Sequence, residues 1–190
     1  MRPEIISQLL GCIWRIVPVM NIYLIGYRCT GKTTVGKLLS QKLSWPILDS
    51  DIELVKEQRR PISEIVEKEG WNSFRSIEKE IIRKLCCLNH HVIATGGGAV
   101  LDPENVGIMR TTGKVIWLKA LPETIARRMA NDKSTENNRP ALTDKGIFDE
   151  IKETLNFRNP IYEGAMDFSI DTDWMTIEEI CNTIQARMKM

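Results

Sequence analysis

Net charge, histidine and paired cysteines are all scarce in this sequence of 190 residues. The formal net charge is +1 at pH 7, so no overall electrostatic field favours binding to nucleic acid or to an anionic membrane. The two histidines, His90 and His91, are neighbours at the start of an expected strand, where they would point to opposite faces and make a poor metal-binding pair. The five cysteines contain no C-x-x-C pair. We therefore expect free thiols in a reducing compartment, the cytoplasm, and neither a disulfide framework nor a zinc site.

The first 19 residues are apolar but lack the features of a targeting segment. Arg15 interrupts the apolar run, no small-residue cleavage site follows it, and the run is too short to span a bilayer. We expect residues 1–19 to be an N-terminal extension and residues 20–190 to form a single domain. With 43% apolar residues in the chain, that domain has enough material for a complete core.

Residues 20–36 have the pattern of a strand, a glycine-rich turn and a helix. An apolar run ends at Gly26, the spacing G-x-x-x-x-G-K-T follows, and apolar residues then recur at helical intervals. In such a loop the glycines let the backbone wrap around phosphate, and the start of the helix points its N–H groups at the same anion. We expect Lys32 to reach the β- and γ-phosphates of ATP and the Thr33 hydroxyl to bind Mg²⁺. The loop residues expected to bind ATP are Gly26, Cys29, Thr30, Gly31, Lys32, Thr33 and Thr34.

Two carboxylates, Asp49 and Asp51, follow the next short apolar stretch. On an extended chain this spacing places both on one face, beyond the end of the strand, where open parallel sheets bind their ligands. An aspartate here also suits the N-cap of the helix that begins at Asp51. Helix capping and contact with substrate or Mg²⁺ are therefore both open.

Residues 52–89 show helical periodicity, with a break at Pro61 and a stop at Gly70. Arg75 and Glu78 are three positions apart, so the pattern predicts an ion pair that fixes the guanidinium. A single arginine on a helix is equally typical of a solvated surface.

A buried-type strand at 91–95 runs into three glycines, residues 96–98. Glycines at this place allow a backbone to approach a ligand closely, or allow two elements to pack tightly. Further along, residues 131–145 are polar and rich in turn residues, which is typical of a mobile lid as well as of an ordinary long surface loop. Arg139, at the far end of this segment, could act as a positive clamp.

The remaining pattern completes an alternation of strands and helices. A helix pattern at 148–164 contains Pro160, which we expect to bend or end it. The expected strands lie at 22–25, 47–48, 91–95, 114–118 and 167–171. This alternation predicts a doubly wound α/β fold with a mostly parallel sheet.

Together these motifs resemble the shikimate kinase family, which are small P-loop kinases of the nucleoside monophosphate kinase-like fold. The matching pieces, in chain order, are GYRCTGKTTVGKLL, D-S-D at 49–51, F-R-x-x-E within EIVEKEGWNSFRSIE, ATGGG at 94–98, R-P-A-L at 139–142 and R-N-P-I-Y at 158–162. The resemblance covers about residues 20–190. It implies a three-layer α/β/α P-loop kinase fold with a five-stranded parallel sheet of order 2-3-1-4-5, a substrate-binding segment at about 51–80 and a lid at about 130–143.

The resemblance also implies an activity, the Mg²⁺- and ATP-dependent phosphorylation of the 3-hydroxyl of shikimate to give shikimate 3-phosphate and ADP, in chorismate and aromatic amino-acid biosynthesis. The residues carried over by motif as catalytic are Lys32, Asp51 and Arg139, the last reaching ATP from the lid. Those carried over for the substrate are Asp51 for its hydroxyls, Arg75 and Arg158 for its carboxylate, and Gly97 through its backbone. Those for Mg²⁺ are Thr33 and Asp49. We expect a monomer that binds shikimate and ATP, and neither nucleic acid nor a membrane.

Three features depart from the family's pattern. Cys29 stands where the family often has glycine, so a side chain crowds the loop. Trp71 stands where the family commonly has an acidic residue. For stacking on adenine, Arg127 and Arg128 are both candidates.

Two other functions are open from the sequence. One is a related small-molecule P-loop kinase that resembles gluconate kinase. The other is a module that senses shikimate or ATP without turnover, which would be marked by loss of Lys32, Asp51 or Arg139; all three are present.

Overall fold

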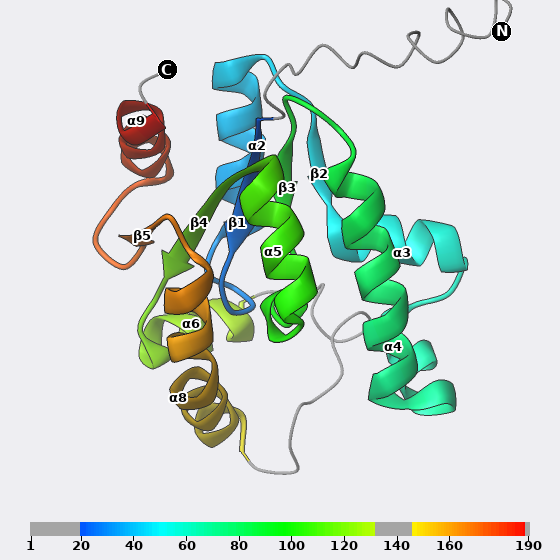
Figure 1. Ribbon diagram of the computed structural model, residues 1–190. Coiled ribbons are helices and arrows are strands. Elements are labelled where there is room, and N and C mark those ends of the chain that lie inside the picture. The colour runs from blue at the N-terminus through cyan, green and yellow to red at the C-terminus, as the bar shows by residue number, and fades with distance from the viewer. Residues whose placement is uncertain (1–19, 132–145, 189–190) are drawn as a thin grey trace, which may run out of the picture.

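The structure is a computed structural model that describes residues 20–131 and 146–188. A five-stranded parallel sheet in the order β2-β3-β1-β4-β5 forms its centre, which confirms the expected fold class and strand order. The strands are β1 (Asn21–Ile25), β2 (Ile47–Asp49), β3 (Val92–Ala94), β4 (Gly113–Lys119) and β5 (Phe168–Asp171). Helices lie on both faces of the sheet and make the three α/β/α layers (Figure 1).

The helices connect successive strands, as a parallel sheet requires. They are α2 (Lys32–Leu43), α3 (Ser50–Gln58), α4 (Ile62–Cys86), the short 3-10 helix η1 (Ala99–Leu101), α5 (Pro103–Thr112), α6 (Pro122–Ala130), α8 (Ile147–Ala165) and α9 (Ile177–Met188). Within the described ranges, none of these helices combines the length and the apolar character that crossing a bilayer requires.

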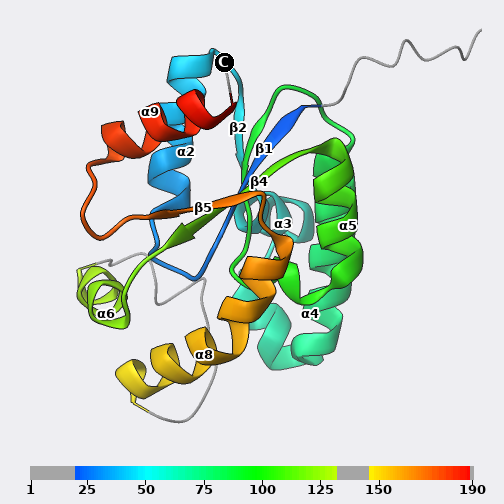
Figure 2. The ribbon, with the colours of Figure 1, turned by 60° about the vertical axis from the view of Figure 1, so that its left-hand side comes forward.

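The central strand β1 lies between β3 and β4 and is buried along its whole length. Because side chains alternate along a strand, Ile22 and Leu24 pack into one core with α2 and α9. Tyr23 and Ile25 pack into the opposite core with α4 and α5. Figure 2 shows these two helical layers on the two sides of the sheet. The carboxyl ends of the strands are thereby held together at one edge, where the loops described below meet.

The three expected helix interruptions can each be located. The break at Pro61 is confirmed, because α3 ends at Gln58 and α4 begins at Ile62 with Pro61 as its N-cap. Gly70 has φ 78° and ψ 169° and breaks α4 into two segments, which confirms the expected stop. Pro160 does not end α8, which continues to Ala165 and changes direction along its length (Figure 2). The helix persists beyond Pro160 because Tyr162 and Ala165 are buried in the core, and this packing offsets the one hydrogen bond that proline removes.

Candidate active site

The loop between β1 and α2 has the backbone of a phosphate cradle. Gly26 has φ 137°, and a Cβ there would overlap the Leu118 carbonyl; Gly31 has φ 96° and caps α2. Cys29 also has a left-handed backbone, with φ 60°, a conformation that costs a non-glycine residue roughly 1 kcal/mol. A glycine at this position would adopt the same backbone without that cost.

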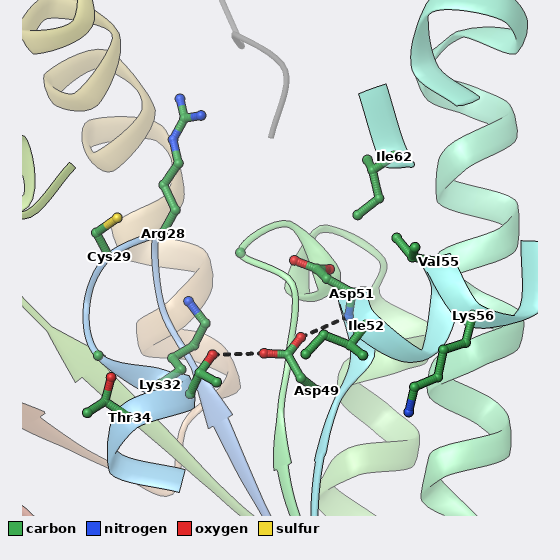
Figure 3. Close-up of a pocket in the computed structure, with 13 residues that line it drawn as sticks. Arg28, Cys29, Lys32, Thr34, Asp49, Asp51, Ile52, Val55, Lys56 and Ile62 are labelled. Carbon is green, nitrogen blue, oxygen red and sulfur yellow. Dashed lines mark hydrogen bonds between the residues drawn. The ribbon is translucent and has the colours of Figure 1, made fainter. Parts of the chain in front are cut away.

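Lys32 lies folded over the loop that precedes it. Its Nζ donates hydrogen bonds of 2.8 Å to the carbonyls of Gly26 and Tyr27. The ammonium therefore sits at the floor of a cavity of about 530 Å³, which Asp49, Asp51 and Gly97 also line. Figure 3 shows Lys32 and the two aspartates facing the same space.

Asp49 has two partners, one for each carboxylate oxygen. Its Oδ1 accepts a hydrogen bond of 3.1 Å from the backbone N–H of Asp51, so it caps α3, as one of the two sequence interpretations held. Its Oδ2 accepts a hydrogen bond of 2.8 Å from the Thr33 hydroxyl. A hydroxyl beside a carboxylate is a pair of hard oxygen donors of the kind that Mg²⁺ binds, with phosphate and water supplying the remaining ligands. The residues present therefore fit this ion.

Arg75 projects from α4 and is held on three sides. Its Nη1 donates a hydrogen bond of 2.5 Å to Glu78 Oε2, which confirms the predicted ion pair. The guanidinium also lies 5.5 Å from the ring centre of Trp71 and 5.0 Å from that of Phe74. Cation–π contacts of this kind restrict the side chain to a few orientations. Trp71, which departs from the family's pattern, thus packs directly on a proposed substrate-binding arginine.

The partner of this arginine, Glu78, is a buried carboxyl group. Burial raises the pKa of Glu78 above its usual value, Arg75 opposes that rise, and the charge of Asp51 adds to it. Oε1 of Glu78 has no hydrogen-bond partner among the described residues. A buried oxygen without a partner is costly, so this atom is a candidate to receive a ligand or water.

The glycines at 96–98 bring the charged side chains together. A Cβ at Gly96 would lie 2.6 Å from Asp51 Oδ1 and 2.8 Å from Glu78 Oε1, and a Cβ at Gly98 would overlap the Arg75 guanidinium. The tight packing expected of this run is confirmed. Gly97 also lines the cavity, and its approach to a ligand stays a prediction. Ser50 fixes the loop by accepting a hydrogen bond of 2.8 Å from the Gly96 N–H.

The middle glycine joins this loop to α8. The Gly97 carbonyl accepts hydrogen bonds from Arg158 Nη1 at 3.1 Å and from the Tyr162 hydroxyl at 2.5 Å. Burial raises the pKa of Tyr162 to about 12, so its hydroxyl remains a donor at neutral pH. Nε of Arg158 is buried and has no hydrogen-bond partner in the described part of the chain. A second guanidinium is thus oriented at the acceptor end of the site with donor capacity to spare.

Of the two arginines considered for adenine, only Arg128 contacts the nucleotide loop. Its guanidinium donates to the Cys29 carbonyl at 3.3 Å and to the Thr172 carbonyl at 2.9 Å, whereas Arg127 is exposed. Arg128 also lines a second cavity, of about 320 Å³, with Thr34 of α2 and Ile177 of α9. This cavity adjoins the loop on the side away from Asp51 and has the apolar lining that a purine base needs.

Some expected residues lie outside the described ranges, and other residues emerge only from the structure. Arg139 and nearly all of the proposed lid lie outside the described residues. Arg28, Tyr162 and Glu150 were given no role from the sequence. The motifs contained the first two, but only three-dimensional contact with Glu150 and with Gly97 shows what they touch.

Comparison with known proteins identifies the family. The family model for shikimate kinase matches residues 28–189. A shikimate kinase of Rhodopirellula baltica is 37% identical over 168 residues, which are 88% of this chain and 90% of the relative. A shikimate kinase of Syntrophus aciditrophicus is 40% identical over 177 residues, which are 89% and 91% of the two chains.

Solved structures agree with the sequence match. The shikimate kinase of Acinetobacter baumannii, solved in complex with shikimate, superimposes with a TM-score of 0.83 at 32% identity, over 90% of this chain and 94% of the other. This chain belongs to the shikimate kinase family.

Proposed function

We propose that the protein is a shikimate kinase, which transfers the γ-phosphate of ATP to the 3-hydroxyl of shikimate and so contributes to chorismate and aromatic amino-acid biosynthesis. Arg75 and Arg158 line another cavity. The observation that carries the proposal is that the glycine run joins these two side chains to the cavity shared by the phosphate loop and Asp51. Lys32, Asp51 and Gly97 line that cavity together, and Gly97 accepts a hydrogen bond from Arg158.

On the nucleotide side, the loop from Gly26 to Thr34 binds the phosphates and Lys32 exchanges its carbonyl partners for phosphate oxygens. The base enters the cavity beside Arg128. Thr33 and Asp49 hold Mg²⁺, which when bound neutralises part of the charge on the phosphates. Helix α2 adds the positive end of its dipole to the same anion.

On the acceptor side, Arg75 and Arg158 bind the shikimate carboxylate. A planar guanidinium matches two carboxylate oxygens at once, and the pairing of Arg75 with Glu78 fixes its direction. Gly97 contributes its N–H, because its carbonyl is already occupied. Asp51 holds the ring hydroxyls, orients the attacking oxygen toward the phosphate and accepts its proton.

Three further assignments belong to this proposal. Residues 51–80 form the substrate-binding segment and residues 130–143 the lid, from which Arg139 reaches the transferred phosphate, while residues 1–19 are an extension outside the catalytic domain. The enzyme acts as a monomer in the cytoplasm. Cys29, Cys86, Cys87 and Cys181 form no disulfide among the described residues, which suits a reducing compartment.

A coupled assay of ADP release tests the function. With Mg·ATP present, we expect turnover that requires shikimate and gives the phosphate ester, identified by phosphorus NMR. Gluconate, with its flexible chain, should give no turnover above background. Preferential turnover of gluconate would favour the related kinase, and binding of shikimate without any turnover would favour the sensor.

A further inference from the structure

Arg28 occupies the point where the phosphate loop meets the glycine run. It follows Gly26 by two positions in the loop and lines the same cavity as Lys32 and Thr33. The backbone of Gly97 approaches the backbone of Arg28 closely, because a Cβ on Gly97 would lie 3.5 Å from the backbone nitrogen of Arg28. Figure 3 shows the side chain rising from the loop at the edge of the cavity. Donor and acceptor sites therefore adjoin at this residue.

The guanidinium of Arg28 forms an ion pair with a carboxylate of α8. Nη2 of Arg28 pairs with Glu150, and the two side chains are 11% and 5% exposed. Nε donates a hydrogen bond of 3.1 Å to the Tyr27 hydroxyl, which in turn donates one of 3.4 Å to Glu150. Arg28 is thus fixed on one side, by Tyr27 of the same loop and by Glu150 of α8.

A purely structural purpose does not account well for this arrangement. Removing two charges from water costs several kcal/mol per ion, and apolar residues of the same volume would often stabilise the fold as well or better. The pair also places a guanidinium, whose N–H donors match the geometry of phosphate oxygens, in the wall of a phosphate cavity. A multiply charged phosphate group competes for this guanidinium more strongly than one carboxylate does.

We propose that Arg28 contacts the γ-phosphate and neutralises it during transfer, and that Glu150 positions the guanidinium while the cavity holds no triphosphate. The inference rests on the proposed function for the identity of the acceptor. The contact between Arg28 and the nucleotide does not depend on which acceptor is used. Arg28 is then a catalytic residue and Glu150 a positioning residue. The negative charge that spreads over the transferred group in the transition state gives the contact its effect on rate.

The decisive experiment compares Arg28→Gln, Glu150→Gln and the double variant. If the pair only stabilises the fold, each single variant leaves one buried charge unpaired, and the double variant regains both stability and kcat. If Arg28 acts on phosphate, the double variant regains stability, but its kcat stays about 100-fold below wild type. Recovery of kcat in the double variant would overturn the proposal.

A second measurement does not depend on shikimate. Arg28→Gln should weaken binding of a non-hydrolysable ATP analogue by about 10-fold and binding of ADP by less than about 2-fold, because ADP lacks the γ-phosphate. Arg28→Lys should recover part of the loss. Arg110→Gln, which removes an exposed arginine bonded to the Gly164 carbonyl, is the matched control and should change neither affinity.

These outcomes separate the two proposals. Equal loss of affinity for the ATP analogue and ADP would refute the role of Arg28, whatever the acceptor is. A clear difference between the two nucleotides in an enzyme that does not turn over shikimate would refute the proposed function and leave the role of Arg28 standing.

Discussion

The nucleotide side and the acceptor side of the site are built from different parts of the chain. The nucleotide side is mostly backbone, shaped by Gly26 and Gly31 in one short loop. The acceptor side is a set of side chains from α3, α4 and α8, packed against glycines of another loop. A backbone cradle tolerates an unusual side chain such as Cys29, whereas the acceptor side depends on each group and on what holds it.

Removing the one side chain on which the nucleotide side depends should have the largest effect. Lys32→Ala should reduce kcat by about 1,000-fold, because the variant loses the ammonium that the loop itself holds against the β- and γ-phosphate oxygens. The fold should survive, since Lys32 is only half-buried and bonds to its own loop. Steady-state kinetics and a thermal unfolding scan measure the two effects. A variant with wild-type kcat would remove Lys32 from the mechanism.

Arg75→Ala should change KM for shikimate much more than KM for ATP. We expect KM for shikimate to rise about 100-fold, since a charged, two-pronged contact is lost, while KM for ATP changes by less than about 2-fold. Arg83→Ala, on the same helix but exposed and paired with Glu80 and Glu104, serves as the control and should change neither constant. A parallel rise of both constants in Arg75→Ala would mean that the residue supports the fold and does not bind substrate.

Trp71 tests whether the acceptor side depends on the groups behind it. Trp71→Ala should raise KM for shikimate by roughly 3-fold, because the cation–π contact that restrains Arg75 contributes roughly 0.5–1 kcal/mol. Trp71→Phe should restore most of the affinity, and ATP should bind as before. If both variants bind shikimate as tightly as wild type, the contact with Arg75 has no part in positioning it.

The raised pKa of Glu78 predicts that the free energy of unfolding depends on pH. Because its folded pKa is raised, the folded protein binds more protons than the unfolded chain as pH rises from the usual glutamate value of about 4.3. The free energy of unfolding contributed by Glu78 therefore falls as pH rises through this interval. Urea unfolding of wild type and Glu78→Gln at several pH values should show the difference moving in favour of the variant. A difference that stays constant with pH would mean that the pKa of Glu78 is not raised on folding.

The sequence predicted the nucleotide side in detail because that side is local. Strand, loop and helix between Asn21 and Leu43 follow one another without a break, and the glycine spacing determines the backbone. The sheet order could be expected from the family resemblance, and the structure confirmed it. The caps at Asp49 and Asp102 also follow from adjacent residues.

What the sequence could not give is contact between distant segments. Tyr27 and Glu150 lie 123 positions apart yet share a hydrogen bond, and no local pattern marks either residue. The overlap that a side chain at Gly98 would make with Arg75 is likewise visible only in the folded chain. For Pro160 the sequence left open whether the helix would bend or end. The helix continues and changes direction along its length, because Tyr162 and Ala165 are buried in the core.

Helix α8 touches both reaction partners' binding loops. Glu150 in its first turn reaches Arg28, and Arg158 reaches the Gly97 carbonyl, roughly 12 Å further along the axis at 1.5 Å per residue. Because the helix is anchored at both places, we expect a displacement of one loop to displace the other. We therefore expect each bound ligand to change the affinity of the protein for the other, and by the same factor.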